Sequence, residues 1–186
     1  MKPATPRKAK PGWSDIKAQL AEFDRAGLLG LVQDLYAVSK DNQTFLHARF
    51  GSADDVLKPY KATIQRWLWP DVTRNQNISV STAKKAIADY RKAIARPAEL
   101  AELMVFYCEQ AAGFSNDVGL EDEGYFNALV RMFEQALKQA NTLPDDERDE
   151  LAARLDDVRH TCSNFGYGVS EDMSDLMAKA GFVDLL

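Results

Sequence analysis

Hydrophobic residues recur every three or four positions along most of the chain, and strict alternation of hydrophobic and polar residues is nearly absent. The first pattern is typical of amphipathic helices and the second of strands, so the sequence predicts an all-α protein. Proline, glycine and polar stretches divide the pattern into eight or nine helices. We expect a single compact domain over residues 14–186, a helical bundle or helix-hairpin-repeat-like array of antiparallel pairs, after a flexible basic tail over residues 1–13.

The most hydrophobic segment begins at Pro97 and is apolar on nearly all sides up to Gly113. Proline favours the first turn of a helix and glycine often follows its end. A helix that is hydrophobic all round lies at the centre of a bundle, so we expect Leu103 and Tyr107 to be buried. Residues 114–121 are expected to form an irregular connection.

The first half of the chain predicts shorter helices. One of them has a heptad-like spacing of three and four positions, carried by Leu28, Leu31, Leu35 and Val38. Another begins near Pro59 and ends at Pro70, because proline is tolerated in a first helical turn but cannot continue a helix. The polar stretch after Pro70 is expected to be a loop.

Acidic and hydroxyl side chains mark two helix starts. Thr142 and Asp145 resemble a capping box, with Pro144 in the first turn. A cluster of oxygen-bearing residues comprises Asn116, Asp117, Glu121, Asp122 and Glu123. We interpret this cluster as capping of the next helix; a calcium loop is the alternative, but the order of its residues lacks the EF-hand spacing.

Charge is strongly segregated, although the net charge of the whole chain is only −5. Residues 1–12 carry a net +4 and residues 13–57 a net −3. Residues 58–96 carry +7, whereas residues 97–186 carry −13. Such a division predicts one basic and one acidic surface rather than a uniformly acidic protein.

Motifs for catalysis, metals or cofactors are absent from the sequence. The two cysteines, Cys108 and Cys162, lie 54 positions apart in helical patterns and form no CxxC pair. We interpret them as small buried hydrophobic residues in a reducing cytoplasm; a thiolate–imidazole pair of Cys108 with His160 is the alternative. No phosphate-binding glycine loop, GxSxG or HExxH is present, and no hydrophobic run approaches the length of a membrane span. We therefore expect a cytoplasmic, membrane-free protein without a cofactor, and favour a non-enzyme.

The basic segment contains the first candidate site. Trp69 precedes Pro70, and Lys84, Lys85, Arg91 and Lys92 flank a hydrophobic stripe on the next helix. An exposed tryptophan beside cations suits nucleic-acid binding, because bases stack on aromatic rings and phosphates attract lysine and arginine. The alternative is that these cations face the acidic C-terminal half, within the chain or across a dimer.

A second candidate site is a polar groove formed by Asn42, His47 and Arg49 near the junction of two helices. Histidine and arginine side chains in a groove suit an anion. The alternative is local capping of the next helix by Asp41 and Asn42.

Two stretches carry a family resemblance. The first runs from Leu31 to Tyr36 and continues through Ser39, Asp41 and Asn42 to residues 45–50; the second comprises residues 100–104, Tyr107, Phe114, Asn116, Gly119, residues 125–127 and Phe133. They resemble the signatures of a bacterial family of all-helical domains of unknown function. The resemblance covers most of residues 14–170 and implies a fold but no catalytic residues. His47 stands where that family usually has an acidic residue.

Together these observations predict a non-enzymatic protein-interaction module that binds a protein partner or associates with itself. The first alternative is a nucleic-acid-binding protein that uses residues 58–96. The second is an enzyme or metal protein of unknown class.

Overall fold

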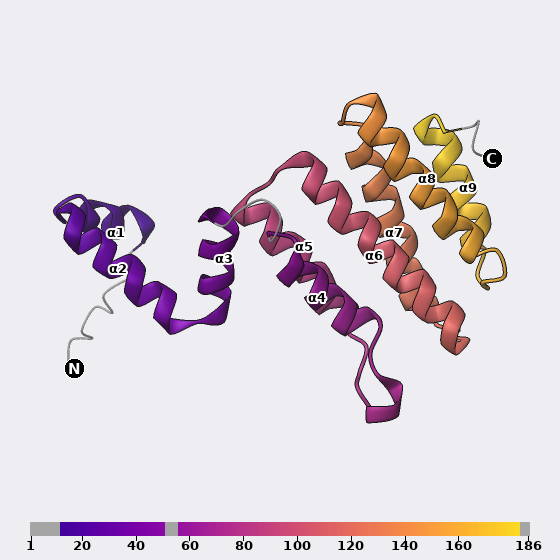
Figure 1. Ribbon diagram of the computed structural model, residues 1–186, viewed down its shortest axis with the longest axis horizontal. Helices are drawn as coiled ribbons and strands as arrows, with labels where there is room; N and C mark the ends of the chain where they lie inside the picture. Colours follow the sequence, from indigo (N-terminus) through magenta and orange to yellow (C-terminus); the bar gives the residue numbers. More distant parts are fainter. Residues whose placement is uncertain (1–11, 51–55, 183–186) are drawn as a thin grey trace, which may run out of the picture. The chain divides into compact units, whose positions relative to one another are not determined.

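The computed structural model describes residues 12–50 and 56–182 and is all-helical within them (Figure 1). These residues form nine α-helices and one short 3₁₀ turn, and they contain no strand. The prediction of an all-α protein with eight or nine helices is confirmed. The chain divides into two compact units, unit 1 up to Thr44 and unit 2 from Phe45 onward. A single domain over residues 14–186 stays a prediction.

Unit 1 contains α1 (Trp13–Leu20), α2 (Arg25–Val38) and the start of α3 (Lys40–Phe50). Acidic side chains hold the starts of the first two helices. The Asp15 carboxylate accepts a hydrogen bond from the Gly12 backbone N–H at 2.8 Å, and Asp24 accepts one from Gly27 at 2.7 Å. Such bonds satisfy N–H groups that have no partner within the helix.

Unit 2 contains the end of α3 and six further helices: α4 (Lys58–Leu68), α5 (Val80–Ala93), α6 (Pro97–Val118), α7 (Glu123–Ala140), α8 (Asp145–Thr161) and α9 (Val169–Ala180). The long helix α6 packs against α4, α5, α7 and α8, and α7 also contacts α9. Figure 1 shows α6 and α7 side by side, with α8 and α9 beyond them. Successive helices are therefore packed neighbours, as expected for short connections.

Helix α6 occupies the centre of unit 2. Leu103 is 0% exposed and Tyr107 1%, so their predicted burial is confirmed. The prediction that this helix ends at Gly113 is wrong, because it continues to Val118 and ends at Gly119, whose φ is 63°. Gly113 is instead a contact point: a Cβ placed on it would lie 2.5 Å from the Trp69 ring. Glycine here makes room for a neighbour rather than ending a helix.

Two predicted caps have different outcomes. Asp122 caps α7 as expected, since its carboxylate accepts a hydrogen bond from the Tyr125 backbone N–H at 2.6 Å. The capping box at Thr142 is not formed. The Thr142 hydroxyl donates back to the Gln139 carbonyl at 2.7 Å, and α8 begins after Pro144 without a side-chain cap. The three acidic residues in the first turn of α8 stabilise that helix start through its dipole.

Candidate functional site

The basic residues predicted on α5 lie mainly on its exposed side. Arg91 and Lys92 are exposed, and within the described residues neither has an acidic partner. Lys85 pairs with Asp89 one turn away at 2.5 Å. Lys84 is half-buried; burial, and then the nearby positive charge of Arg131 on α7, lower its pKa. The exposed end of α5 thus remains positively charged.

Trp69 does not join these cations in one surface. It follows the last residue of α4 and is 37% exposed, with the edge of its ring packed on Gly113 of α6. The Ser79 backbone N–H bonds to the Trp67 carbonyl at 3.0 Å, so α5 starts near Trp69. At 1.5 Å per residue, Arg91 lies about 18 Å farther along α5. Trp69 is a packing residue between α4 and α6.

The three residues of the predicted polar groove have separate surroundings. The Asn42 side chain donates to the Leu35 carbonyl at 2.6 Å, and its backbone N–H donates to Ser39 Oγ at 3.1 Å, so it joins α2 to α3. Arg49 donates through Nη1 to the Ala93 carbonyl, at 3.4 Å, in the last turn of α5. His47 is exposed and lies two residues from Arg49, about 200° around the same helix. Asn42 and Arg49 thus bond to different partners, and His47 and Arg49 point to different sides of α3.

A charge network across unit 2 was not predicted. Glu102 on α6 pairs with Lys61 on α4 at 2.5 Å and with Arg154 on α8. Arg154 also donates two bonds to Glu109, at 2.8 and 3.0 Å. Burial by itself raises the pKa of Glu102, but the bonds from Arg154 and Lys61 and their charges lower it overall. Glu102 and Glu109 are seven positions apart and therefore lie on one face of α6. This spacing is the feature of the sequence from which the charge network could have been predicted.

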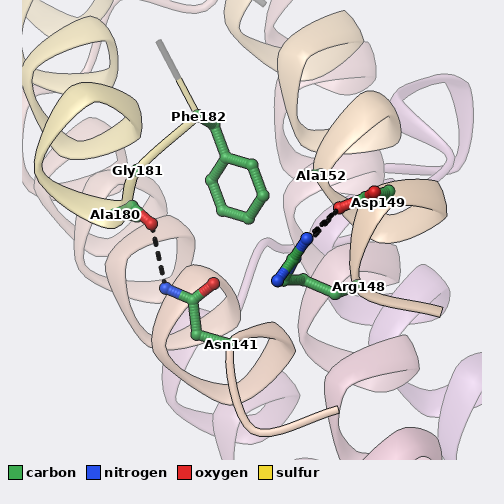
Figure 2. A pocket seen from close by; sticks show the side chains of 7 residues that line it. All are labelled: Asn141, Arg148, Asp149, Ala152, Ala180, Gly181 and Phe182. Atoms are coloured by element: carbon green, nitrogen blue, oxygen red, sulfur yellow. Dashed lines mark hydrogen bonds and ion pairs between the residues drawn. The ribbon is translucent and has the colours of Figure 1, made fainter. Parts of the chain in front are cut away.

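A cleft of about 500 Å³ lies where the end of α7, the start of α8 and the end of α9 meet (Figure 2). Asn141 donates to the Ala180 carbonyl at 3.1 Å on one side. On the other side Arg148 pairs with Asp145 and Asp149, each at 2.8 Å. Figure 2 shows the Phe182 ring between Asn141 and Arg148. The cleft combines polar and hydrophobic groups, and its arginine is paired with two carboxylates, so it offers no unpaired positive charge to an anionic ligand.

A smaller cleft of about 310 Å³ lies where the α4–α5 connection meets the α6–α7 turn, lined by Ile78, Val80, Leu120, Asp122, Gly124 and Tyr125. Its polar groups are occupied. Asp122 caps α7, and the Tyr125 hydroxyl donates to the Leu68 carbonyl at 3.0 Å. The remaining lining is hydrophobic and has no group suited to acid–base chemistry.

The cysteines behave as hydrophobic residues. Both are buried and free; burial raises the pKa of Cys108 far above its usual value and that of Cys162 to about 12. A protonated thiol is a poor nucleophile and metal ligand. His160 is exposed, with Nδ1 2.9 Å from the Asp156 carbonyl oxygen. Within the described ranges, no group of three histidine, cysteine or acidic residues is arranged to hold a metal.

The most unusual surface of the molecule is on unit 1, and it was not predicted. Neither α1 nor α2 contains a buried residue. Ten large hydrophobic residues are exposed there: Trp13, Ile16, Phe23, Leu28, Leu29, Leu31, Val32, Leu35, Tyr36 and Val38. We call these residues the unit 1 hydrophobic surface. The sequence indicated this surface through the hydrophobic residues between Leu28 and Val38, which cover more of the helix circumference than a single hydrophobic stripe does.

The chain matches no protein-family model, no curated protein and no solved structure. The resemblance to a bacterial helical family stays a prediction. Among the residues that the structure describes, no helix combines the length and the hydrophobicity needed to cross a membrane.

Proposed function

We propose that this protein is a non-enzymatic protein-interaction module and that the unit 1 hydrophobic surface is its binding element. The observation that carries the proposal is the exposure of ten large hydrophobic residues on α1, α2 and their flanks, without one buried residue in either helix. Exposed hydrophobic patches of this kind mark surfaces that another molecule covers.

The stability of unit 1 supports the same proposal. Short helices are marginal in water unless a hydrophobic face is packed. Chains below about 40 residues generally need a metal, a disulfide or association to fold. Unit 1 has 44 residues, which is close to that limit, and it contains no cysteine. A binding partner supplies the missing hydrophobic contacts.

The titratable groups favour binding over catalysis. The two thiols are buried, and the acids of the interhelix network are held by Lys61 and Arg154. Catalytic groups need access to a substrate and a pKa near the working pH. Free, buried cysteines also fit the proposed cytoplasmic location.

Site-specific photo-crosslinking in cells tests the proposal. A photo-reactive phenylalanine analogue replaces Leu29, which is 61% exposed, and in a matched control replaces Tyr167 on unit 2, which is 63% exposed. We expect a discrete polypeptide adduct from position 29 and none from position 167. No adduct at position 29, or equal adducts at both positions, would contradict the proposal. Mass spectrometry of the adduct identifies the partner.

Nucleic-acid binding is a second candidate, favoured by the exposure of Arg91 and Lys92 at the end of α5. Two observations weigh against it: Trp69 is packed on Gly113, and Lys85 is paired with Asp89. Without a stacking residue near the cations, the site offers phosphate attraction alone. The interaction module is therefore the better-supported function.

A further inference from the structure

We infer that the partner of the unit 1 hydrophobic surface is the same surface on a second copy of this chain, so that α1 and α2 of two chains form an intermolecular helical bundle. This inference rests on the proposed function and names its partner. Three observations carry it: the arrangement of hydrophobic residues around α2, the area they expose and the charges beside them.

The hydrophobic residues of α2 cover about half of its circumference, given 100° per residue. One edge is the stripe of Leu28, Leu31, Leu35 and Val38, spaced by three and four positions. That spacing is the a/d repeat with which helices pair along a seam. The other edge is formed by Leu29, Val32 and Tyr36. A helix with two such stripes packs against more than one neighbour, as in a four-helix bundle of two helical hairpins.

The exposed area is sufficient for a stable dimer. A fully exposed large side chain presents on the order of 150–250 Å². Weighted by their exposed fractions, the ten residues present roughly 900 Å² per chain. A standard protein–protein interface buries about 800 Å² per partner. The hydrophobic area that one chain exposes is therefore about as large as the area that each partner buries in a standard interface.

The charges of α1 and α2 are compatible with self-association. The two helices carry two basic residues, Lys17 and Arg25, which are balanced by Asp15 and Asp34. Helices that bind membrane surfaces carry many lysine and arginine residues on their polar face. Over its 44 residues unit 1 carries seven basic and five acidic residues, a net charge of +2. A small net charge with both signs present permits two copies to associate.

The described surface of unit 2 exposes fewer large hydrophobic residues than unit 1 does. They are Phe45, Phe50, Trp69, Val72, Val118 and Tyr167, against ten on unit 1. Trp69 is further restricted by its contact with Gly113. A second copy of the chain brings a hydrophobic surface of the same size as the one it covers.

Sedimentation equilibrium of the purified full chain tests the inference at about 100 μM protein, a concentration that populates interfaces of moderate affinity. We expect twice the 20.8 kDa mass of one chain. Leu29→Glu and Leu35→Glu should each reduce the mass to that of one chain, because glutamate is charged but retains helix propensity. Val72→Glu is the matched control: Val72 is 54% exposed and Leu35 50%, and this variant should remain dimeric.

Every outcome decides the inference. A monomeric wild-type chain overturns it, as does a dimer that both unit 1 variants leave intact or that Val72→Glu also dissociates. Circular dichroism of each variant confirms that the helices of unit 2 remain folded. The crosslinking experiment separates the two proposals: an adduct of position 29 with a different polypeptide, together with a monomeric purified chain, retains the interaction module but rejects the second copy.

Discussion

Helices α2 and α7 show how differently the two units use hydrophobic residues. Nine of the 14 residues of α2 are hydrophobic, a larger fraction than in α7, yet no residue of α2 is buried. In α7, nine of 18 residues are buried, because α6, α8 and α9 pack around it. Burial is therefore a property of a helix's neighbours as much as of its own sequence. A hydrophobic helix whose own unit leaves its side chains uncovered is the kind of surface that we propose for association.

The largest expected effect compares the centre of unit 2 with the surface of unit 1. Leu103→Ala should lower the free energy of unfolding by about 2–5 kcal/mol, because it leaves a cavity in α6, where Leu103 is fully buried. Leu29→Ala should change it by less than about 0.5 kcal/mol. Urea denaturation followed by circular dichroism measures both.

The two alanine variants should be made in the Leu35→Glu background, so that loss of association does not contribute to either value. Equal destabilisation by Leu103→Ala and Leu29→Ala would break the comparison, since α2 would then be packed as closely as α6.

The next effect tests the contact between Trp69 and Gly113. Glycine to alanine in a helix interior ordinarily stabilises by about 1 kcal/mol. Gly113→Ala should instead destabilise unit 2 by about 1–3 kcal/mol, because the new Cβ overlaps the Trp69 ring. Thermal or urea denaturation shows whether the substitution stabilises or destabilises unit 2.

The double variant Trp69→Ala with Gly113→Ala is the control. With the ring removed, the Gly113→Ala substitution should regain its ordinary stabilising sign. Stabilisation by the single variant would show that Trp69 moves freely and is available for stacking on a ligand.

A smaller and pH-dependent effect tests the charge network. Glu102 is ionised at pH 7, with a folded pKa below its ordinary value of 4.5. A lowered folded pKa stabilises above the unfolded value, and this contribution is lost as the pH falls through the folded pKa. Glu102→Gln should therefore cost about 1 kcal/mol at pH 7, a value reduced by solvent screening of the partly exposed pair.

The difference between wild type and Glu102→Gln should shrink as the pH falls below 4.5. Denaturation midpoints at pH 7, 5 and 3.5 measure it. A difference that stays constant over this range would mean that packing of the side chain, not its charge, stabilises the three helices.

The smallest expected effect concerns the exposed end of α5. Replacing Arg91 and Lys92 by glutamine should change stability by less than about 0.5 kcal/mol, because both side chains are exposed and lack acidic partners in the described chain. We also expect no binding of single- or double-stranded nucleic acid by the wild-type protein in fluorescence anisotropy at low salt. Binding that the double variant weakens, with a flatter salt dependence, would favour the second candidate function.

Sequence reasoning succeeded where a feature depends on residues close together in the chain. Pro59 lies in the first turn of α4, α6 starts at Pro97, and Asp122 caps α7, as predicted. It failed at Gly113, because glycine after a hydrophobic run marks a helix end in one context and a close contact in another. Only the position of Trp69, 44 residues earlier, distinguishes the two.

The candidate sites show the same division. The exposure of Arg91 and Lys92 followed from their place beside the hydrophobic stripe of α5. The sequence placed Trp69 near the basic segment, but α5 carries Arg91 and Lys92 away from it. Asn42 and Arg49 are close in sequence, yet each bonds a different partner. Proximity along a helix does not by itself make side chains converge, because rotation around the axis and neighbouring elements decide where they point.

By itself the sequence determined the helical class, most helix boundaries and the central position of α6, because hydrophobic periodicity, proline and local capping act within a few residues. Only the tertiary structure decided that α6 passes through Gly113, that Glu102 links α4 to α8, and that the residues of α2 stay exposed while those of α7 are buried. These outcomes depend on contacts between segments far apart in the chain. The physical reason is that burial and ion pairing are set by which surfaces meet, and a periodic pattern specifies a face but not its partner.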